Sequence, residues 1–374
     1  MSVVYKKLED VCEILDSRRV PITAKDRKAG TYPYYGANGL QDYVADYIFD
    51  DELVLLAEDG GNFGSKERPI AYRVSGKCWV NNHAHVLKAK PNMHVDYLCY
   101  ALMFYDTEGL VNGATRQKLT QAAMRQMVIP YRDMTEQLQI IKKISQIVRS
   151  IEKRKEELQL LDQLVKSRFI ELFGDYDLTH PQESWVTIKE IGTVVGGATP
   201  KTDHDEYWGG SYRWITPAEL DADSGYIYDS VRKLTKAGVE SCSLQEMPVG
   251  TVILSSRAPI GKVAIAGNTF YCNQGFKNII CKEGITPRYL YTVLLLNVEY
   301  LNSLGRGATF KEISKGIVES IRIPVPLMDL QQQFAAFVEQ TDKSKYYSSL
   351  SFRYCQAAAN TYRQEWMTCR TSDF

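Results

Sequence analysis

Residues 133–173 read DMTEQLQIIKKISQIVRSIEKRKEELQLLDQLVKSRFIELF, a run of about forty residues without glycine or proline. Apolar residues recur along it in steps of three, four and seven, at Leu138, Ile141, Ile144, Val148, Ile151, Leu158, Leu161, Val165, Phe169 and Leu172. This spacing is typical of a helix that packs lengthwise against a second helix. Asp133 and Glu136 occupy capping-box positions at its beginning, and Gly174 follows its last residue. We therefore predict a helix of roughly 60 Å at 1.5 Å per residue, and not the core helix of a single compact domain.

The motif that leads into this run occurs a second time later in the sequence. Residues 113–141 read GATRQKLTQAAMRQMVIPYRDMTEQLQII, and residues 307–335 read GATFKEISKGIVESIRIPVPLMDLQQQFA. Three matches share the offset of 194 residues, namely Gly113 with Gly307, Pro130 with Pro324 and Gln137 with Gln331. Tyr97-Leu98 and Tyr289-Leu290 match at the nearly equal offset of 192 residues. Self-similarity at a fixed period indicates a duplicated structural unit, so we predict the order domain, long helix, domain, long helix.

The fold class that this order predicts is α+β. We expect a mixed α/β domain at residues 1–131, a long helix at 132–174, a second mixed domain at 175–327, and a second long helix with a tail at 328–374. In both domains, short runs of β-favouring residues alternate with glycine and asparagine clusters. We expect the two helices to pair as an antiparallel coiled coil, with a seam at Ile144, Val148, Ile151, Leu158, Leu161, Val165, Phe334 and Phe337. Beyond Thr341 the spacing is carried by Tyr347, Leu350, Tyr354, Tyr362 and Trp366, and the sequence leaves open whether this part completes the second coil.

The composition excludes several classes of protein and favours none. Lysine plus arginine and aspartate plus glutamate each number 45, so net charge argues neither for nor against a polyanionic partner. The eight cysteines form no Cys-x-x-Cys pair, which indicates reduced thiols and no zinc site. No signal-like start and no run of 18 apolar residues occur, so we expect a cytoplasmic protein without contact to a membrane.

Signatures of catalysis are missing from the sequence. It has no phosphate-binding loop with the required spacing and no Asn-Pro-Pro-Tyr or Asp-Pro-Pro-Tyr tetrapeptide of an adenine methyltransferase. The carboxylate clusters at residues 50–52 and 58–59 are interpreted as solvated turns, because no lysine stands at a nuclease spacing. His83 and His85 would share one side of a strand, but no third ligand lies nearby in the sequence, so we predict no metal site. We predict no cofactor bound by this chain.

Nucleic-acid binding is better supported. Polar turns that are rich in amides end the sheet region of each domain, at residues 81–85 and 272–277, and glycine-containing loops follow a buried strand at residues 59–68 and 255–262. Asparagine and glutamine can bind adenine bidentately, arginine and lysine can bind guanine, and basic side chains and loop amides can contact phosphates. The candidate DNA-contacting residues are Asn62, Lys66, Arg68, Asn81, Asn82, His83, His85, Thr115, Arg116 and Lys118 in the first domain, and Ser256, Arg257, Lys262, Asn273, Gln274, Lys277, Thr309 and Lys311 in the second. Asn82 and Asn273 are predicted to read bases; for any one of these residues a role in a capped turn or as a surface charge is the alternative.

The duplicated GAT turn, the Ile-Pro before each glutamine-rich helix start, and the segment SSRAPIGKVAI at residues 255–265 resemble a type I restriction–modification specificity subunit. The resemblance extends to about Val338. It implies two target recognition domains, each reading one half of a split site in double-stranded DNA, and two helices that hold the domains apart. It also implies partners: two modification subunits with S-adenosylmethionine, and restriction subunits with ATP and Mg. The alternative is a coiled-coil scaffold or inhibitor that binds the same partner subunits without reading DNA.

Overall fold

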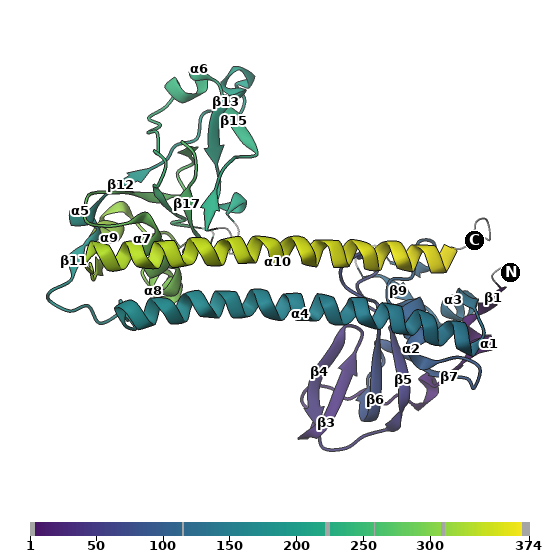
Figure 1. Ribbon diagram of the computed structural model, residues 1–374. Helices are drawn as coiled ribbons and strands as arrows, with labels where there is room; N and C mark the ends of the chain where they lie inside the picture. The colour runs from purple at the N-terminus through teal and green to yellow at the C-terminus, as the bar shows by residue number, and fades with distance from the viewer. Residues whose placement is uncertain (1–3, 114–115, 221–224, 258, 308–310, 369–374) are drawn as a thin grey trace. The chain divides into compact units, whose positions relative to one another are not determined.

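The computed structural model of this chain describes residues 4–113, 116–220, 225–257, 259–307 and 311–368 (Figure 1). The chain divides into two compact units. Unit 1 comprises Met1–Glu157 with Ser348–Phe374, and unit 2 comprises Leu158–Tyr347. Each unit therefore contains one globular domain together with a part of both long helices.

Unit 1 is built on a six-stranded mixed sheet with the strand order β2-β7-β5-β6-β3-β4. Its central strands are buried on both faces, because the run Leu53-Val54-Leu55-Leu56 in β5 places alternate side chains into two apolar clusters. The β3–β6 pair is parallel and the other neighbours are antiparallel. The strands are β2 (Cys12–Ile14), β3 (Ala29–Gly36), β4 (Gly39–Val44), β5 (Phe49–Ala57), β6 (Ala71–Val80) and β7 (Ala84–Ala89), and α2 (Val95–Leu102) packs on β5 and β6.

Unit 2 divides its strands between a five-stranded sheet, β12-β19-β16-β17-β14, and a three-stranded sheet, β15-β13-β18. The β14–β17 and β13–β18 pairs are parallel, so both sheets are mixed. The bounds are β12 (Gly192–Gly196), β13 (Trp208–Ile215), β14 (Tyr226–Ile227), β15 (Arg232–Leu234), β16 (Val252–Leu254), β17 (Val263–Ala266), β18 (Tyr271–Cys272) and β19 (Lys277–Cys281). Helix α7 (Pro287–Leu296) packs on β16 and β17. The predicted α+β class with two mixed domains is confirmed.

The shorter elements repeat between the units. Strand β1 (Val4–Lys7) pairs with β10 (Val128–Tyr131) in unit 1, and β11 (Val186–Thr187) pairs with β20 (Arg322–Ile323) in unit 2. Each of these pairs joins the beginning of a domain to the residues just before its long helix. The remaining elements are β8 (Val111–Asn112), β9 (Lys118–Leu119), and the helices α1 (Leu8–Val11), α3 (Gln121–Gln126), α5 (Ile188–Ile191), α6 (Lys236–Glu240), α8 (Val298–Ser303) and α9 (Lys315–Ser320). Three 3-10 turns, η1 (Asp16–Arg18), η2 (Asp205–Tyr207) and η3 (Pro217–Glu219), complete the described elements.

The two long helices are α4 (Met134–Phe173) and α10 (Met328–Thr368). At the start of α4, the Asp133 Oδ1 atom accepts a hydrogen bond from the Glu136 backbone N–H at 2.9 Å, as predicted. At its end, Gly174 has φ of +89°, a left-handed conformation that favours glycine. Helix α10 continues without a break beyond Thr341, so the second long helix is complete to the end of the described residues. No helix among the described residues has both the length and the apolar character needed to cross a membrane.

The helices contact each other in antiparallel fashion within each unit. In unit 1, Lys143 lies 5.5 Å from the ring centre of Tyr362 and Lys155 lies 5.8 Å from that of Phe352. In unit 2, Phe169 and Phe334 pack edge to face at 5.4 Å, and Asp162 forms an ion pair with Lys345. In both units, the residue numbers of the contacts rise along α4 as they fall along α10.

Burial reveals the heptad seam of each helix. On α4 the shielded positions follow steps of four and three at Ile140, Ile144, Ile147, Ile151, Arg154, Leu158, Leu161, Val165, Arg168 and Leu172, and on α10 they follow the same steps at Gln331, Phe334, Val338, Thr341, Lys345, Ser348, Phe352, Cys355, Ala359 and Tyr362. The predicted seam residues all lie at or beside these positions. The predictions for Leu138, Tyr347 and Tyr354 were wrong, since these side chains are exposed. The seam of α10 includes the polar residues Thr341, Lys345 and Ser348, so the spacing of apolar residues alone did not reveal it.

A buried glutamine ties each long helix to its own domain. Gln137 is fully buried; its Oε1 accepts the His94 N–H at 2.8 Å, and its Nε2 donates to the carbonyls of Asn92 at 3.0 Å and Arg132 at 2.8 Å. Gln331 repeats this in unit 2, with Oε1 accepting from Thr286 at 2.8 Å and Nε2 donating to Gly284 at 3.0 Å and Pro326 at 2.9 Å. The matching residues of the sequence repeat thus build the same joint twice.

A tyrosine completes the joint. The Tyr97 hydroxyl donates to the Pro130 carbonyl at 2.9 Å in unit 1, and the Tyr289 hydroxyl donates to the Pro324 carbonyl at 3.0 Å in unit 2. These bonds connect α2 and α7 to the backbone that enters each long helix. The repeated tyrosine, Ile-Pro and glutamine of the sequence are therefore parts of one structural device.

We expect Gln137→Ala to lower the free energy of unfolding by roughly 2–4 kcal/mol, because three partly buried backbone groups lose their hydrogen-bond partner and the fully buried side chain is lost. Urea denaturation measures the change. Gln139→Ala, an exposed glutamine on the same turn of α4, is the matched control and should cost less than about 0.5 kcal/mol. Equal effects of the two substitutions would contradict a structural role for the amide.

Candidate nucleic-acid interface

The strand ends of unit 1 form a polar edge that we call rim 1: residues 58–60 after β5, residues 81–83 before β7, and residues 116–118 at β9. Backbone hydrogen bonds hold the three segments together. The Glu58 N–H donates to the His83 carbonyl at 2.8 Å, and the Leu119 N–H donates to the Glu58 carbonyl at 2.8 Å. Residues distant in the sequence are thereby fixed side by side.

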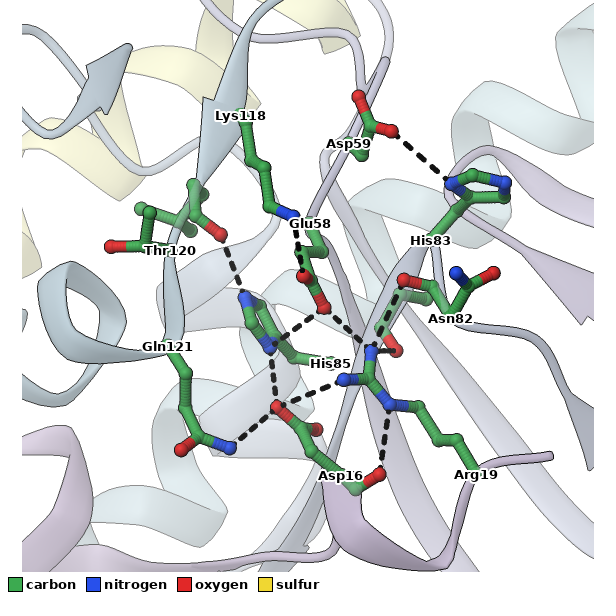
Figure 2. A network of polar contacts seen from close by, with 12 residues as sticks. Asp16, Arg19, Glu58, Asp59, Asn82, His83, His85, Lys118, Thr120 and Gln121 are labelled. Carbon is green, nitrogen blue, oxygen red and sulfur yellow. Dashed lines mark hydrogen bonds and ion pairs between the residues drawn. The ribbon is translucent and has the colours of Figure 1, made fainter. Parts of the chain in front are cut away.

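Beneath rim 1 lies a buried ionic network centred on His85 (Figure 2). His85 is fully buried in β7; its Nδ1 lies 2.6 Å from Asp16 Oδ2, and its Nε2 lies 2.9 Å from the Leu119 carbonyl oxygen. Asp16 Oδ1 accepts the Val86 N–H at 2.9 Å, and Gln121 donates to Asp16 Oδ2 at 2.9 Å. Burial alone would raise the pKa of Asp16, but these hydrogen bonds and the neighbouring His85 hold the pKa below its usual value.

Arg19 and Lys118 neutralise the second carboxylate of the network. Arg19 Nη1 lies 2.6 Å from Glu58 Oε2, and Lys118 Nζ lies 3.2 Å from Glu58 Oε1. Asp16, Glu58 and His85 do present donor atoms within 4.8 Å of one another, but His83, the other histidine of the pair considered from the sequence, is not a member of this group. Because cationic side chains already occupy both oxygens of Glu58, the cluster has the character of an internal ion-pair network that stiffens the rim.

The outer part of rim 1 carries the more accessible groups. Asp59 Oδ1 lies 2.7 Å from Arg116 Nε, and Asp59 Oδ2 lies 3.3 Å from His83 Nδ1. Asn82 is exposed, whereas Asn81 is buried, with its Nδ2 donating to Gln41 Oε1 at 3.1 Å and its Oδ1 accepting the His83 N–H at 2.8 Å. Of the predicted contact residues here, Arg116, Lys118, Asn82 and His83 reach the surface, while Asn81 and His85 shape the rim from inside.

A loop next to rim 1 contains three further candidates. Lys66 and Arg68 are exposed. Asn62 is half-buried, and its Nδ2 donates to the Pro69 carbonyl at 3.4 Å, which closes the loop. The two cations are therefore placed as surface charges, and the asparagine as a turn residue.

Unit 2 has a corresponding edge, which we call rim 2: residues 255–257 after β16, residues 273–275 before β19, and residues 311–313. Ser256 is fully buried, and its Oγ accepts a hydrogen bond from Lys277 Nζ at 3.3 Å. Lys277 also pairs with Glu312 Oε1 at 3.1 Å. The Ser256 N–H donates to the Gly275 carbonyl at 2.8 Å, and the Ile313 N–H donates to the Ser256 carbonyl at 3.0 Å, so the three segments are fastened as in rim 1.

The other predicted residues of rim 2 differ in whether their polar side-chain groups are already bound within the chain. Lys262 Nζ donates to the Pro217 carbonyl at 3.1 Å, and Asn273 Oδ1 accepts the Gly275 N–H at 2.9 Å. Gln274 is exposed, and its Oε1 accepts from the Thr199 hydroxyl. Arg257 is half-buried and Lys311 is exposed, and neither has a carboxylate within ion-pair distance in the described part of the chain. The candidates Thr115 and Thr309 lie outside the described residues.

Sequence reasoning missed the acidic and cationic partners of the rims, which are Asp16, Arg19, Glu58, Asp59 and Glu312. The carboxylates at 58–59 were interpreted as a solvated turn, yet Glu58 is bound by Arg19, His85 and Lys118. A usable signal was the position of this pair directly after the buried run of β5. The sequence held no signal for Asp16 and Arg19, because they follow β2 and are about forty residues away from Glu58 in the chain.

Comparisons with known proteins give the same family along most of the chain. Residues 2–161 and 183–346 match the family described as the type I restriction modification DNA specificity domain. The chain is 42% identical over 185 residues to the type I restriction enzyme MjaIX specificity subunit of Methanocaldococcus jannaschii, a match that covers 48% of this chain and 43% of that protein. It is 26% identical over 311 residues to the EcoR124I/EcoR124II specificity subunit of Escherichia coli, covering 79% and 72%. The chain thus spans less than half of the first relative and about seven tenths of the second.

A solved structure shares the fold. The S subunit of a type I restriction-modification system from M. genitalium superposes with a TM-score of 0.60 at 14% identity, covering 98% of this chain and 96% of that one. At this identity the likeness concerns the fold alone. It agrees with two mixed-sheet domains that each continue into a long helix.

We expect Asp16→Asn to destabilise the chain at pH 7 by about 2–4 kcal/mol, since His85 and Arg19 lose a buried anionic partner. A carboxyl whose pKa is lowered by folding contributes stability above its unfolded pKa near 3.9 and loses this contribution as the pH falls through its folded pKa. The difference in unfolding free energy between wild type and Asp16→Asn should therefore shrink as the pH is lowered from about 5 to 3, as measured by urea denaturation. The exposed Asp175→Asn serves as control, and a pH-independent difference would contradict the ionic role.

Proposed function

This chain belongs to the type I restriction-modification DNA specificity family, and we propose that it is the non-catalytic subunit that gives such a complex its target sequence. Unit 1 would read one half of a bipartite site in double-stranded DNA, and unit 2 the other half. The chain would itself carry no cofactor. A protein with this task acts on cellular DNA, which fits a cytoplasmic location.

The observation that supports this proposal best is the pair of rims. Both are assembled by the same backbone hydrogen bonds at equivalent strand ends, and both offer arginine, lysine and amide side chains of the kinds that contact phosphates and base edges. Their side chains nevertheless differ at almost every position. One frame with two different sets of polar groups suits the reading of two different short sequences, so the whole site should be asymmetric.

The long helices are proposed to set the spacing between the half-sites and to dock the modification subunits, two of them per chain as the two-fold repeat suggests. S-adenosylmethionine would be bound by these modification subunits, and ATP and Mg by the restriction subunits. The continuous heptad seams of α4 and α10 support the role as a ruler, because a paired helix has a fixed rise of 1.5 Å per residue. Successive major-groove faces recur about every 34–36 Å along DNA, a distance that a helix of forty residues can span.

Methylome sequencing of cells with and without this gene tests the proposed function. Removal of the gene should abolish N6-methyladenine at one split, asymmetric motif and leave all other methylation unchanged. The motif would give both half-sites and the spacer. An unchanged methylome would contradict the proposal and favour a coiled-coil scaffold that reads no DNA, which footprinting of the assembled complex would then test.

A paired insertion of seven residues tests the helices as a ruler. One heptad is added between Arg154 and Lys155 of α4 and one between Ser351 and Phe352 of α10, so that both seams keep their register. Each helix lengthens by about 10.5 Å, which corresponds to about three base pairs at 3.4 Å each. We expect the preferred spacer in the methylome to grow by about this amount while both half-sites stay unchanged.

The control inserts seven residues after Pro181, in the exposed connection that follows α4. It adds the same mass without lengthening a helix, so the spacer should not change. Half-sites that change with the paired insertion, or a spacer that changes with the control, would show that the helices do not determine the spacing.

A further inference from the structure

The two rims can be superimposed residue by residue through their backbone hydrogen bonds. Glu58 and Ser256 correspond, because each donates to the segment before the next strand, at His83 and Gly275 respectively, and each accepts from Leu119 or Ile313. Backbone bridges Asp59–Lys118 and Arg257–Glu312 extend the correspondence by one residue in each direction. Asp59 of unit 1 therefore stands where Arg257 stands in unit 2, and Lys118 where Glu312 stands.

The charges at these corresponding positions are inverted. Rim 1 has an acid at the strand end and a base on the facing segment, Asp59 and Lys118, whereas rim 2 has a base and an acid, Arg257 and Glu312. The inner position is not inverted, since His85 in rim 1 corresponds to Lys277 in rim 2, and each of these basic residues lies beside a carboxylate, Asp16 and Glu312 respectively. The backbone is retained while the side-chain polarity is reversed.

In rim 1, Asp59 forms an ion pair with the Nε side of the Arg116 guanidinium. The ion pair of 2.7 Å uses the Nε of Arg116, and Arg116 Nη2 lies 3.5 Å from His83 Nδ1. A guanidinium has five N–H donors, so the Nη end retains the parallel pair of donors that matches O6 and N7 of guanine. Arg116 is also the most exposed member of this group, with 61% of its side chain accessible against 21% for Asp59.

In rim 2, the arginine is the strand-end residue itself. Gly275, at the position of His83, lies beside it: a Cβ there would make an ordinary contact of 3.4 Å with Arg257 Nε and a tighter one of 3.0 Å with Asn273 Oδ1. Two neighbouring cations are engaged, because Lys277 pairs with Glu312 and Lys262 donates to the Pro217 carbonyl, while the exposed Lys311 is a lysine without a bidentate fork. Arg257, the arginine of rim 2, has no carboxylate within ion-pair distance in the described part of the chain, so its guanidinium can bind a base.

We propose that Asp59 is a positioning residue that orients Arg116 to read a guanine of the first half-site, and that Arg257, at the corresponding position, reads a guanine of the second. This inference rests on the proposed function and adds the residues and the base that they recognise. The reversed polarity of the rims places the reading arginine on opposite segments of the same frame, on the β9 side in unit 1 and on the β16 side in unit 2. Each domain thereby presents its arginine from a different direction.

The test uses the full chain assembled with its modification subunits and DNA that carries the split motif. Each guanine is replaced in turn by 7-deazaguanine, which keeps Watson–Crick pairing and lacks the N7 acceptor. Wild type should lose about tenfold or more in affinity at one guanine of each half-site. Arg116→Gln should remove this sensitivity in the first half-site alone, and Arg257→Gln in the second alone, so each domain controls for the other.

Asp59→Asn should weaken the sensitivity of the first half-site and leave the second intact, whereas Asp59→Glu, which keeps the charge, should restore part of it. Arg68→Gln, an exposed arginine of the adjacent loop, is the matched control and should change affinity equally on all DNAs. If Asp59→Asn does not fold, Asp59→Glu tests the positioning, because a carboxylate displaced by one methylene should give only partial sensitivity, and Arg116→Lys tests the bidentate reading, because a lysine lacks the fork and should lose the sensitivity while overall affinity is largely kept.

Full sensitivity to 7-deazaguanine in Asp59→Asn would show that this carboxylate positions nothing. Loss of affinity on every DNA in Arg116→Gln or Arg257→Gln would assign these arginines to phosphates, and a half-site without guanine on either strand would exclude the reading proposed for its domain. Each of these results overturns the inference and leaves the specificity role standing. Absence of any sequence preference in the wild-type complex would instead refute the proposed function.

Discussion

The amide of Gln137, with its counterpart Gln331, is the constraint on which each half of the molecule depends. A long helix that leaves a globular domain must satisfy the backbone groups where the two meet, which here are partly buried, and a buried group without a partner costs about 1–3 kcal/mol. One glutamine satisfies three of them and joins the beginning of the long helix to the residues that precede α2 or α7. With the tyrosine–proline hydrogen bond beside it, this joint fixes the direction in which each helix leaves its own domain.

The rims show how one main-chain arrangement can carry two different sets of polar side chains. Main-chain hydrogen bonds assemble the strand ends of both units in the same way, so the side chains are free to differ without loss of the fold. In unit 1 the buried pairing of Asp16, His85, Glu58 and Arg19 stabilises the base of the rim, and in unit 2 Ser256 and Lys277 stand at the places of Glu58 and His85. At the rims, the two units therefore share the main-chain frame and differ in the side chains that it carries.

The helix pair combines apolar and polar layers. Phenylalanines and aliphatic residues pack at the outer parts of the seams, whereas Thr341, Lys345 and Ser348 occupy seam positions in the middle part of α10. Thr341 donates to the Phe337 carbonyl and Lys345 pairs with Asp162, so these polar groups are satisfied locally. Polar residues at seam positions cost stability and favour one register over others.

The sequence by itself determined the long helix, the duplication and the mixed domains, because periodicity and internal matches are local properties of the chain. It also placed Arg116, Lys118 and Arg257 on loops beside buried strands. Only the tertiary structure decided that His85, Asn81 and Ser256 lie inside, that Asp16 and Arg19 join Glu58, and that Asp59 faces Arg116. The physical reason is strand pairing: which side chains meet at the end of a sheet depends on register between strands far apart in the chain, and no pattern within one strand specifies that register.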